Sequence, residues 1–313
     1  MNRSVIEYAE QRSRGRTRVR KYPIIPANIP QKLPKLVGIG AVLWDVYGTL
    51  LGHPMGDVVE HSLMEKSTKR AFIKTAAEYG LEKFLGGDPA TVLRKLYDDE
   101  IEKIHRRKRA QGVFSPEVKI EEVWLRILRQ LEGKGYISGE GPVDMELALK
   151  VAYYFDDAQQ FKVLYPGARR TLEMIRKKGL RQGIVSNAQF YTPITLNILL
   201  RNSVSVAVEA MDELFDHDLV VFSYALGVGK PNPSLYEKAR DRLIEMGIEP
   251  SRVIHVGNDM LYDAVLARKV GFKAVFFAGD RRSVTLRKDD PEASGFEPDA
   301  VIKSLPQLIE ILA

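Results

Sequence analysis

Short apolar runs, separated by longer polar stretches, recur along the 313-residue chain. They are rich in β-branched or aromatic residues, do not alternate with polar ones, and lie at residues 38–44 (GIGAVLW), 183–185 (GIV), 219–222 (LVVF), 253–256 (VIHV) and 274–277 (AVFF). Strands that are buried on both faces of a parallel sheet have this non-alternating pattern. We therefore predict that these runs form the strands of one parallel sheet.

Helical patterns lie between these runs. Residues 168–178 (ARRTLEMIRKK) place Leu172 and Ile175 at helical spacing, and Gly179 follows where a helix would end. Residues 233–246 begin with Pro-Ser and end just before a glycine, which are start and stop signals of a helix. This alternation predicts an α/β fold: a Rossmann-like parallel sheet core with right-handed crossovers and helices on both faces.

Residues 56–165 interrupt this alternation directly after the first predicted strand. The stretch has amphipathic helical patterns, at residues 62–79 and 92–108, and little that is typical of a strand. We interpret it as an inserted helical subdomain. The predicted organisation is then a core formed by residues 37–55 and 166–313, with the helical insert at residues 56–165.

The first 36 residues are basic and contain several prolines. Residues 1–35 carry nine Arg and Lys side chains against two Glu, so this stretch has a net charge of +7 and the rest of the chain −1. Four prolines within residues 23–36 favour an extended linker. We interpret residues 1–36 as a solvated extension, which is the one segment through which we would expect contact with nucleic acid or acidic lipid.

Composition narrows the class of protein. Hydrophobic residues make up 45% of the chain and charged residues 28%, as in ordinary soluble globular proteins. The chain has no cysteine, which excludes disulfides, thiolate nucleophiles and cysteine-ligated zinc and favours a reducing, cytoplasmic location. No apolar run reaches the roughly 18 residues that would span a bilayer. The oligomeric state is left open.

Polar side chains gather in four fragments that follow predicted strands. The fragments are 41–51 (AVLWDVYGTLL) with Asp45, Tyr47 and Thr49, 183–188 (GIVSNA) with Ser186 and Asn187, 227–233 (GVGKPNP) with Lys230, and 256–264 (VGNDMLYDA) with Asn258, Asp259 and Asp263. Ligands of open parallel sheets bind at the carboxyl ends of the strands. The sequence therefore predicts one site at this edge.

The order Asp…Ser…Lys…Asp/Asp on successive strands resembles the haloacid dehalogenase-like hydrolase superfamily. The resemblance covers residues 38–313, including the closing PDAVIKSLPQLIEIL segment as the last strand and helix, and its most specific part is Asp-x-x-Gly-Thr-Leu after an apolar run. It implies that residues 56–165 are the family's helical cap. It also implies roles for individual side chains: Asp45 attacks phosphorus or carbon, Thr49, Ser186 and Asn187 contact the substrate, and Lys230 neutralises its charge.

Physical chemistry supports these roles. A carboxylate nucleophile forms a covalent intermediate, which divides one difficult displacement into two easier steps. Phosphoryl transfer needs the phosphate charge countered, as Mg²⁺ and a lysine can do. Mg²⁺ prefers oxygen ligands. The resemblance implies that these come from Asp45, the backbone carbonyl of Tyr47 and the fourth fragment (Asn258, Asp259 and Asp263). The sequence does not decide between Asn258 and Asp259.

One position departs from the phosphatases of the family. They have a second aspartate two residues after the nucleophile, as general acid and base, whereas this chain has Tyr47. A positioned acid contributes about 10²–10⁴ in rate, and a phenol is a poor substitute for a carboxylic acid. The 2-haloacid dehalogenases have tyrosine here, because a leaving halide needs no proton. Those enzymes, however, work without metal and lack the acidic fourth motif that this chain keeps, and Arg70 is the nearest candidate for their carboxylate-binding arginine.

Three functions follow as hypotheses. The first is a Mg²⁺-dependent phosphatase that acts on a small, anionic phosphorylated metabolite through an aspartyl-phosphate at Asp45. The second is a metal-independent 2-haloacid dehalogenase, which loss of activity in EDTA would exclude. The third is a catalytically weak member of the family that binds a ligand or partner, for which activity unchanged by Asp45→Asn would be the sign. Nothing in residues 56–165 indicates which substrate is bound.

Overall fold

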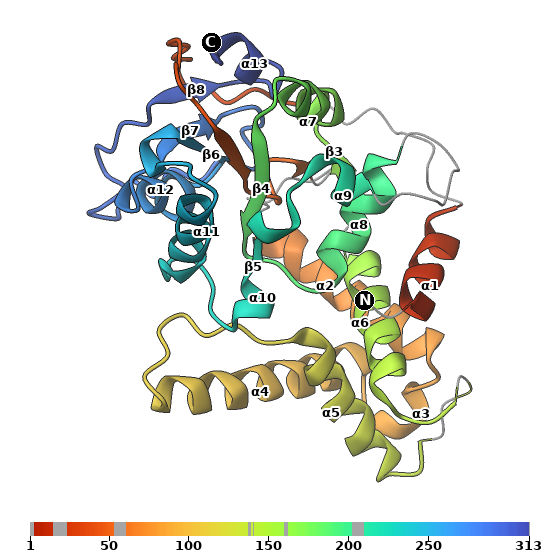
Figure 1. Cartoon of the computed structure of the whole chain (residues 1–313). Coiled ribbons are helices and arrows are strands. Elements are labelled where there is room, and N and C mark those ends of the chain that lie inside the picture. Colours follow the sequence, from red (N-terminus) through yellow and green to blue (C-terminus); the bar gives the residue numbers. More distant parts are fainter. Residues whose placement is uncertain are drawn as a thin grey trace. The chain divides into compact units, whose positions relative to one another are not determined.

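The computed structural model describes residues 3–14, 24–52, 61–136, 139, 141–159, 162–201 and 210–312. The chain divides into two compact units. The helical unit takes in residues 1–19, 59–161 and 189–195, and the α/β unit takes in residues 20–58, 162–188 and 196–313. Figure 1 follows the chain from one terminus to the other.

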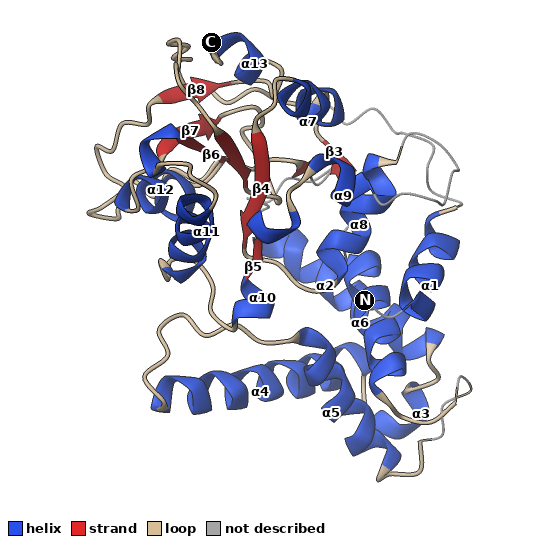
Figure 2. Cartoon of the chain, viewed as in Figure 1, coloured by secondary structure: helices blue, strands red, loops and turns tan. Residues whose placement is uncertain are grey.

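A six-stranded sheet forms the centre of the α/β unit (Figure 2). β1 (Ala41–Trp44) pairs in parallel with a strand on each side, which places Trp44 opposite Ile184 and Val256. Each of the five predicted runs contributes a strand, so the predicted parallel α/β fold is confirmed. In spatial order the strands are β5 (Val220–Phe222), β4 (Arg181–Ser186), β1 (Ala41–Trp44), β6 (Val253–Gly257), β7 (Lys273–Phe277) and β8 (Ala300–Ile302).

Side chains of β1 are buried on both faces of the sheet. Val42 and Trp44 belong to an apolar cluster that includes residues of α7 and α13, whereas Ala41 and Leu43 belong to a second cluster with residues of α11 and α12. Helices therefore cover both faces, which explains why the strand shows no polar alternation. These helices are α7 (Ala168–Lys177), α11 (Ser234–Glu245), α12 (Leu266–Lys269) and α13 (Gln307–Ile311).

Shorter elements complete the α/β unit. An antiparallel pair that the sequence analysis did not predict, β2 (Leu51–Gly52) with β3 (Val163–Leu164), joins the two chain segments on either side of the long insertion. α8 (Tyr191–Leu200) begins in the helical unit and ends in the α/β unit. The remaining elements are α9 (Ala210–Leu214), α10 (Ser223–Leu226), the 3₁₀ turns η1 (His217–Leu219) and η2 (Pro250–Arg252), and the π-helical turn η3 (Met260–Val265).

Residues 24–36 are extended, as their prolines predict, but they are attached to the α/β unit. Lys32 exchanges two backbone hydrogen bonds with Val301 of β8, and the Leu36 N–H donates to the carbonyl of Ile311. Ala27 and Leu36 are buried. The interpretation of this stretch as solvated is therefore wrong for these residues, because backbone pairing and two apolar side chains hold it against the sheet edge.

The helical unit contains α1 (Arg3–Ser13), α2 (His61–Glu78), α3 (Glu82–Leu85), α4 (Pro89–Ala110), α5 (Ile120–Glu132) and α6 (Met145–Gln159). Phe72, Tyr97, Trp124 and Phe155 form its aromatic core, with ring centroids 4.5–6.3 Å apart.

α1 packs within the helical unit, although its sequence is part of the predicted solvated extension. Its Val5 and Ala9 are buried, and the Arg12 guanidinium lies 3.3 Å from Asp157. The prediction that residues 1–36 are a solvated extension is therefore wrong for α1 as well. Among the residues that the structure describes, no helix combines the length and apolarity that crossing a membrane requires.

Candidate active site

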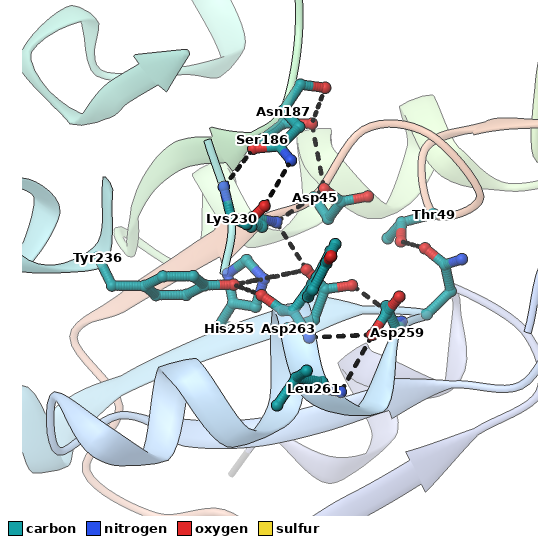
Figure 3. A network of polar contacts seen from close by, with 12 residues as sticks. Asp45, Thr49, Ser186, Asn187, Lys230, Tyr236, His255, Asp259, Leu261 and Asp263 are labelled. Carbon is teal, nitrogen blue, oxygen red and sulfur yellow. Dashed lines mark hydrogen bonds and ion pairs between the residues drawn. The ribbon is translucent and has the colours of Figure 1, made fainter. Parts of the chain in front are cut away.

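The carboxyl ends of β1, β4 and β6 bring three of the four polar fragments to one edge of the sheet. Asp45 follows β1 directly, Ser186 is the last residue of β4, and Asn258 follows β6. Because β1 lies between the other two strands and runs parallel to both, these residues emerge side by side. Lys230 reaches the same place from the loop that leads into α11, as Figure 3 shows.

Lys230 lies between two carboxylates. Its Nζ atom is 2.9 Å from Oδ1 of Asp45 and 2.6 Å from Oδ1 of Asp263. Only 2% of the lysine side chain is exposed, against 10% of Asp45 and 4% of Asp263. The Ser186 hydroxyl donates a hydrogen bond of 3.1 Å to the same Asp45 oxygen. A cation and a hydroxyl thus hold Asp45 from two sides.

The charges of this group depend on burial and on Lys230. Burial raises the pKa of Asp45, and the negative charge of Asp263 raises it further. The positive charge of Lys230 lowers it but does not outweigh burial, so the pKa of Asp45 is about 7. Burial acts in the same direction on Asp263, but contacts with Lys230 and His255 outweigh it and lower the pKa of Asp263. The two carboxylates likewise raise the pKa of Lys230 despite its burial. The ionised fraction of Asp45 therefore increases as the pH rises through about 7.

Two further buried side chains support Asp263. The Tyr236 hydroxyl donates to the backbone carbonyl of Tyr262 at 2.8 Å and lies 2.9 Å from His255 Nε2. Both groups approach Asp263 Oδ1 to 3.4 Å. His255 is buried within the apolar run of β6, and Tyr236 is not among the residues predicted for the site. Its position in the first turn of α11, just after the Lys230 loop, is a signal that could have indicated it.

Two predicted substrate-binding residues have partners within the protein. The Asn187 amide brackets the backbone of Lys230: its Oδ1 accepts from the Lys230 N–H at 2.7 Å, and its Nδ2 donates to the Lys230 carbonyl at 3.2 Å. The fully buried Thr49 donates to Asn258 Oδ1 at 3.0 Å. Contact of Asn187 and Thr49 with a substrate stays a prediction, while their structural roles are to hold the Lys230 loop and the fourth fragment.

Asn258 and Asp259 face different partners. The Asn258 amide accepts from Thr49 and donates to the Ser283 carbonyl at 2.6 Å. It lies under the turn at Gly48, which has φ +81°, and a Cβ at Gly48 would be 2.4 Å from Asn258 Nδ2. Only glycine fits this turn. Asp259, in contrast, binds the Arg287 guanidinium and accepts from two N–H groups at the start of η3.

Tyr47 lies at the position of the family's general acid. Its side chain is partly buried and packs against the apolar cluster on one face of the sheet. The ammonium group of Lys162, a buried residue, is 6.0 Å from the centroid of its ring. Tyr47 is therefore flanked by a cation, and its ring is held by packing.

The side chains predicted to hold Mg²⁺ do not fit that ion as they stand. Asp263 is bound by Lys230 and by the Asp259 N–H, Asp259 by Arg287, and Asn258 by the partners described above. Both oxygens of Asp259 and of Asp263 have partners, whereas the partners of Asp45 among the described residues all bind Oδ1. Within the described part of the chain, no three Asp, Glu, His or Cys side chains gather into a set that could hold a metal ion.

The chain is similar in sequence and in fold to known proteins. The family model of the haloacid dehalogenase-like hydrolases matches residues 39–271. A glyceraldehyde 3-phosphate phosphatase of Pyrococcus furiosus is 32% identical over 47% of this chain and 53% of its own length, so this chain spans about half of that relative. Haloacid dehalogenase-like hydrolase domain-containing protein 3 of Danio rerio is 24% identical over 85% of this chain and 93% of its own length. A 2-haloacid dehalogenase structure from Pseudomonas syringae pv. Tomato has a TM-score of 0.55 and 21% identity, with 87% of this chain and 97% of that chain covered, and shows the shared fold.

Proposed function

Because the chain belongs to the haloacid dehalogenase-like hydrolases, we propose that it hydrolyses small phosphomonoesters with Asp45 as the nucleophile. The observation that carries this proposal is the buried Lys230 ammonium at 2.9 Å from Asp45, at the carboxyl edge of the sheet. Relatives named as phosphatases support the choice of phosphorus as the reacting atom, among them a phosphoserine phosphatase of Thermus thermophilus that is 31% identical over 52% of this chain and 57% of its own length.

The reaction has two steps. A carboxylate oxygen of Asp45 bonds to phosphorus while the bond from phosphorus to the alcohol oxygen breaks, and the departing alkoxide takes up a proton. Water then attacks phosphorus, the bond to Asp45 breaks, and inorganic phosphate leaves with the carboxylate regenerated. Lys230 counters the negative charge of the phosphoryl group, and Ser186 orients the nucleophile. We assign proton donation to Tyr47, which lies at the family's acid position and takes a proton back from the attacking water in the second step.

Three finer points belong to the same proposal. Residues 56–165, most of which belong to the helical unit, serve as the cap that selects the substrate. A cytoplasmic location rests on the lack of cysteine. Magnesium dependence, which the family resemblance implies, has no support from the side chains of the fourth fragment, because these are engaged with protein partners.

Phosphate release from a panel of small phosphoesters tests the proposed function, measured with Mg²⁺ and with EDTA. We expect release from at least one substrate, and we expect the Asp45→Asn variant to lack it. Loss of the activity in EDTA would mean that the fourth fragment rearranges to admit a metal, and it would exclude the dehalogenase. No release from any substrate, with or without Mg²⁺, would contradict the proposal.

Tyr47→Asp should accelerate hydrolysis of substrates with poor leaving groups. A carboxylic acid donates a proton to an alkoxide far better than a phenol does, so kcat on alkyl phosphates should rise by about 10²-fold, the lower end of what a positioned acid contributes. An aryl phosphate such as p-nitrophenyl phosphate should change little, because its leaving group needs no proton. Tyr47→Phe serves as the control for packing. An equal change on both substrate types would exclude proton transfer as the cause.

A 2-haloacid dehalogenase is the second candidate, and two observations favour it. Tyr47 suits a leaving halide, and cationic side chains of the protein bind the two carboxylates of the fourth fragment. Arg70, the nearest candidate for the arginine that binds the substrate carboxylate, is exposed on α2 of the helical unit. Halide release from 2-chloropropionate that persists in EDTA would establish this function in place of the first.

A further inference from the structure

The loop after β7 contains an arginine with a strained backbone. Arg287 has φ +49°, in the left-handed region that non-glycine residues rarely adopt. Such a conformation costs free energy, and it persists where surrounding contacts enforce it. The contacts of the Arg287 side chain therefore indicate which interactions hold the backbone in this conformation.

Those contacts end on one carboxylate of the fourth fragment. Arg287 Nε lies 2.7 and 2.9 Å from the two oxygens of Asp259, and Nη2 lies 2.7 Å from Oδ2. The guanidinium carbon is 3.8 Å from the centroid of the Tyr262 ring. A bidentate pair that is also stacked on an aromatic face fixes both position and orientation, which a lysine could not do.

The backbone of the same loop is bonded to the same fragment. The Thr285 N–H donates to the Asn258 carbonyl at 3.0 Å, and the Met260 N–H donates to the Thr285 carbonyl at 2.8 Å. The Ser283 carbonyl accepts from the Asn258 side chain. Residues 283–287 thus form a strap along the fourth fragment, and Arg287 closes it.

Asp259 connects the loop of residues 283–287 to Asp263, the residue that binds Lys230. Its carboxylate accepts from the N–H groups of Leu261 and Tyr262 at 3.0 and 2.9 Å, which caps η3. Its own N–H donates to Asp263 Oδ2 at 2.9 Å, while Asp263 Oδ1 binds Lys230. Figure 3 shows the chain of contacts from Asp259 through Asp263 and Lys230 to Asp45.

We propose that Arg287 is a positioning residue: its clamp on Asp259 fixes the start of η3, and thereby sets Asp263 and Lys230 against Asp45. Asp259 is then the partner of an internal cation, and not a ligand of magnesium. This inference rests on the proposed function, because the alignment matters for catalysis only if Asp45 and Lys230 act on a substrate.

A double-mutant cycle tests the clamp. Arg287→Met and Asp259→Asn each break the ion pair, and asparagine still caps η3. We expect each variant to lower kcat by about tenfold with little change in KM, and the double variant to be no slower than the slower single variant. Arg287→Lys should not restore the rate, because the fork geometry is lost. Losses that multiply in the double variant would overturn the proposal, as would rescue by lysine.

Arg268→Met is the matched control. Arg268 also pairs with an aspartate, Asp299 at 2.6 Å, and its guanidinium lies 5.6 Å from the ring centroid of Phe296. Both partners lie outside the fourth fragment. Its substitution should leave kcat unchanged. An equal loss of kcat in Arg268→Met would show that any broken surface ion pair has this effect, and would contradict a specific role of Arg287.

Hydrogen exchange separates a failure of this inference from a failure of the proposed function. In Arg287→Met, the amides of Leu261, Tyr262 and Asp259 should exchange faster than in the wild-type protein, while those of β1 stay protected. This readout needs no substrate. If exchange is accelerated but the wild-type protein has no phosphatase activity, the role of Arg287 in fixing η3 is supported and the proposed function is contradicted. Unchanged exchange at these amides would contradict the clamp, whatever the activity.

Discussion

Asp45→Asn is expected to reduce phosphate release by at least about 10³-fold, because the amide that replaces the carboxylate is not a nucleophile. The substitution preserves shape, and an amide oxygen at this position still accepts from Lys230 and Ser186, so binding of substrate should change much less than kcat. Initial rates at saturating substrate measure the loss. Retention of more than a few per cent of the wild-type kcat would exclude Asp45 as the attacking group.

The pH dependence of the wild-type enzyme provides an independent check on the same residue. Burial raises the pKa of Asp45 to about 7, and attack requires the ionised form. Below this pH, kcat/KM should therefore fall about tenfold for each unit of pH, and above it the rate should level off. A rate that stays constant from pH 5 to pH 8 would mean that another group limits the reaction or that Lys230 keeps Asp45 ionised throughout.

Site residues could be predicted from the sequence where a reactive side chain comes directly after a buried strand. Asp45 and Ser186 each come at the end of an apolar run, and parallel pairing brings such ends together whatever the connecting segments do. Lys230 was found through its motif, since it lies in a loop before a helix. For these residues a short sequence motif is enough to predict the position of the side chain, because the parallel sheet brings the ends of its strands to one edge.

Residues that depend on one long-range contact could not be anticipated. Arg287 lies in a loop without periodicity, and nothing in its neighbourhood indicates that it binds Asp259, 28 residues earlier. The attachment of Lys32 to Val301 uses backbone groups alone, which leave no trace in the sequence. The partners of Asn258 could likewise not be anticipated, because Thr49 and Ser283 lie in distant segments of the chain.

Lys230→Met should impair both catalysis and folding. Methionine keeps much of the side-chain volume but removes the charge that Asp45 and Asp263 share. Without this cation, the developing charge on the phosphoryl group loses its counterpart, so kcat should fall by about 10²–10³-fold. Removal of one member of a buried ion group leaves uncompensated charge, which costs about 3–5 kcal/mol of the free energy of unfolding. Denaturant titration at pH 8 measures this loss.

A second variant separates the two effects of Lys230. In Lys230→Met/Asp263→Asn, one of the stranded carboxylates is gone, so we expect most of the stability to return while kcat stays low. The stability deficit of the single variant should also shrink as the pH falls. Without Lys230 the pKa of Asp45, already raised in the wild-type protein, rises further, and the lowered pKa of Asp263 rises above its value in the unfolded chain. Protonation at low pH then removes the buried charges. If the double variant recovered activity together with stability, Lys230 would be a structural counter-ion and would have no role in neutralising the substrate.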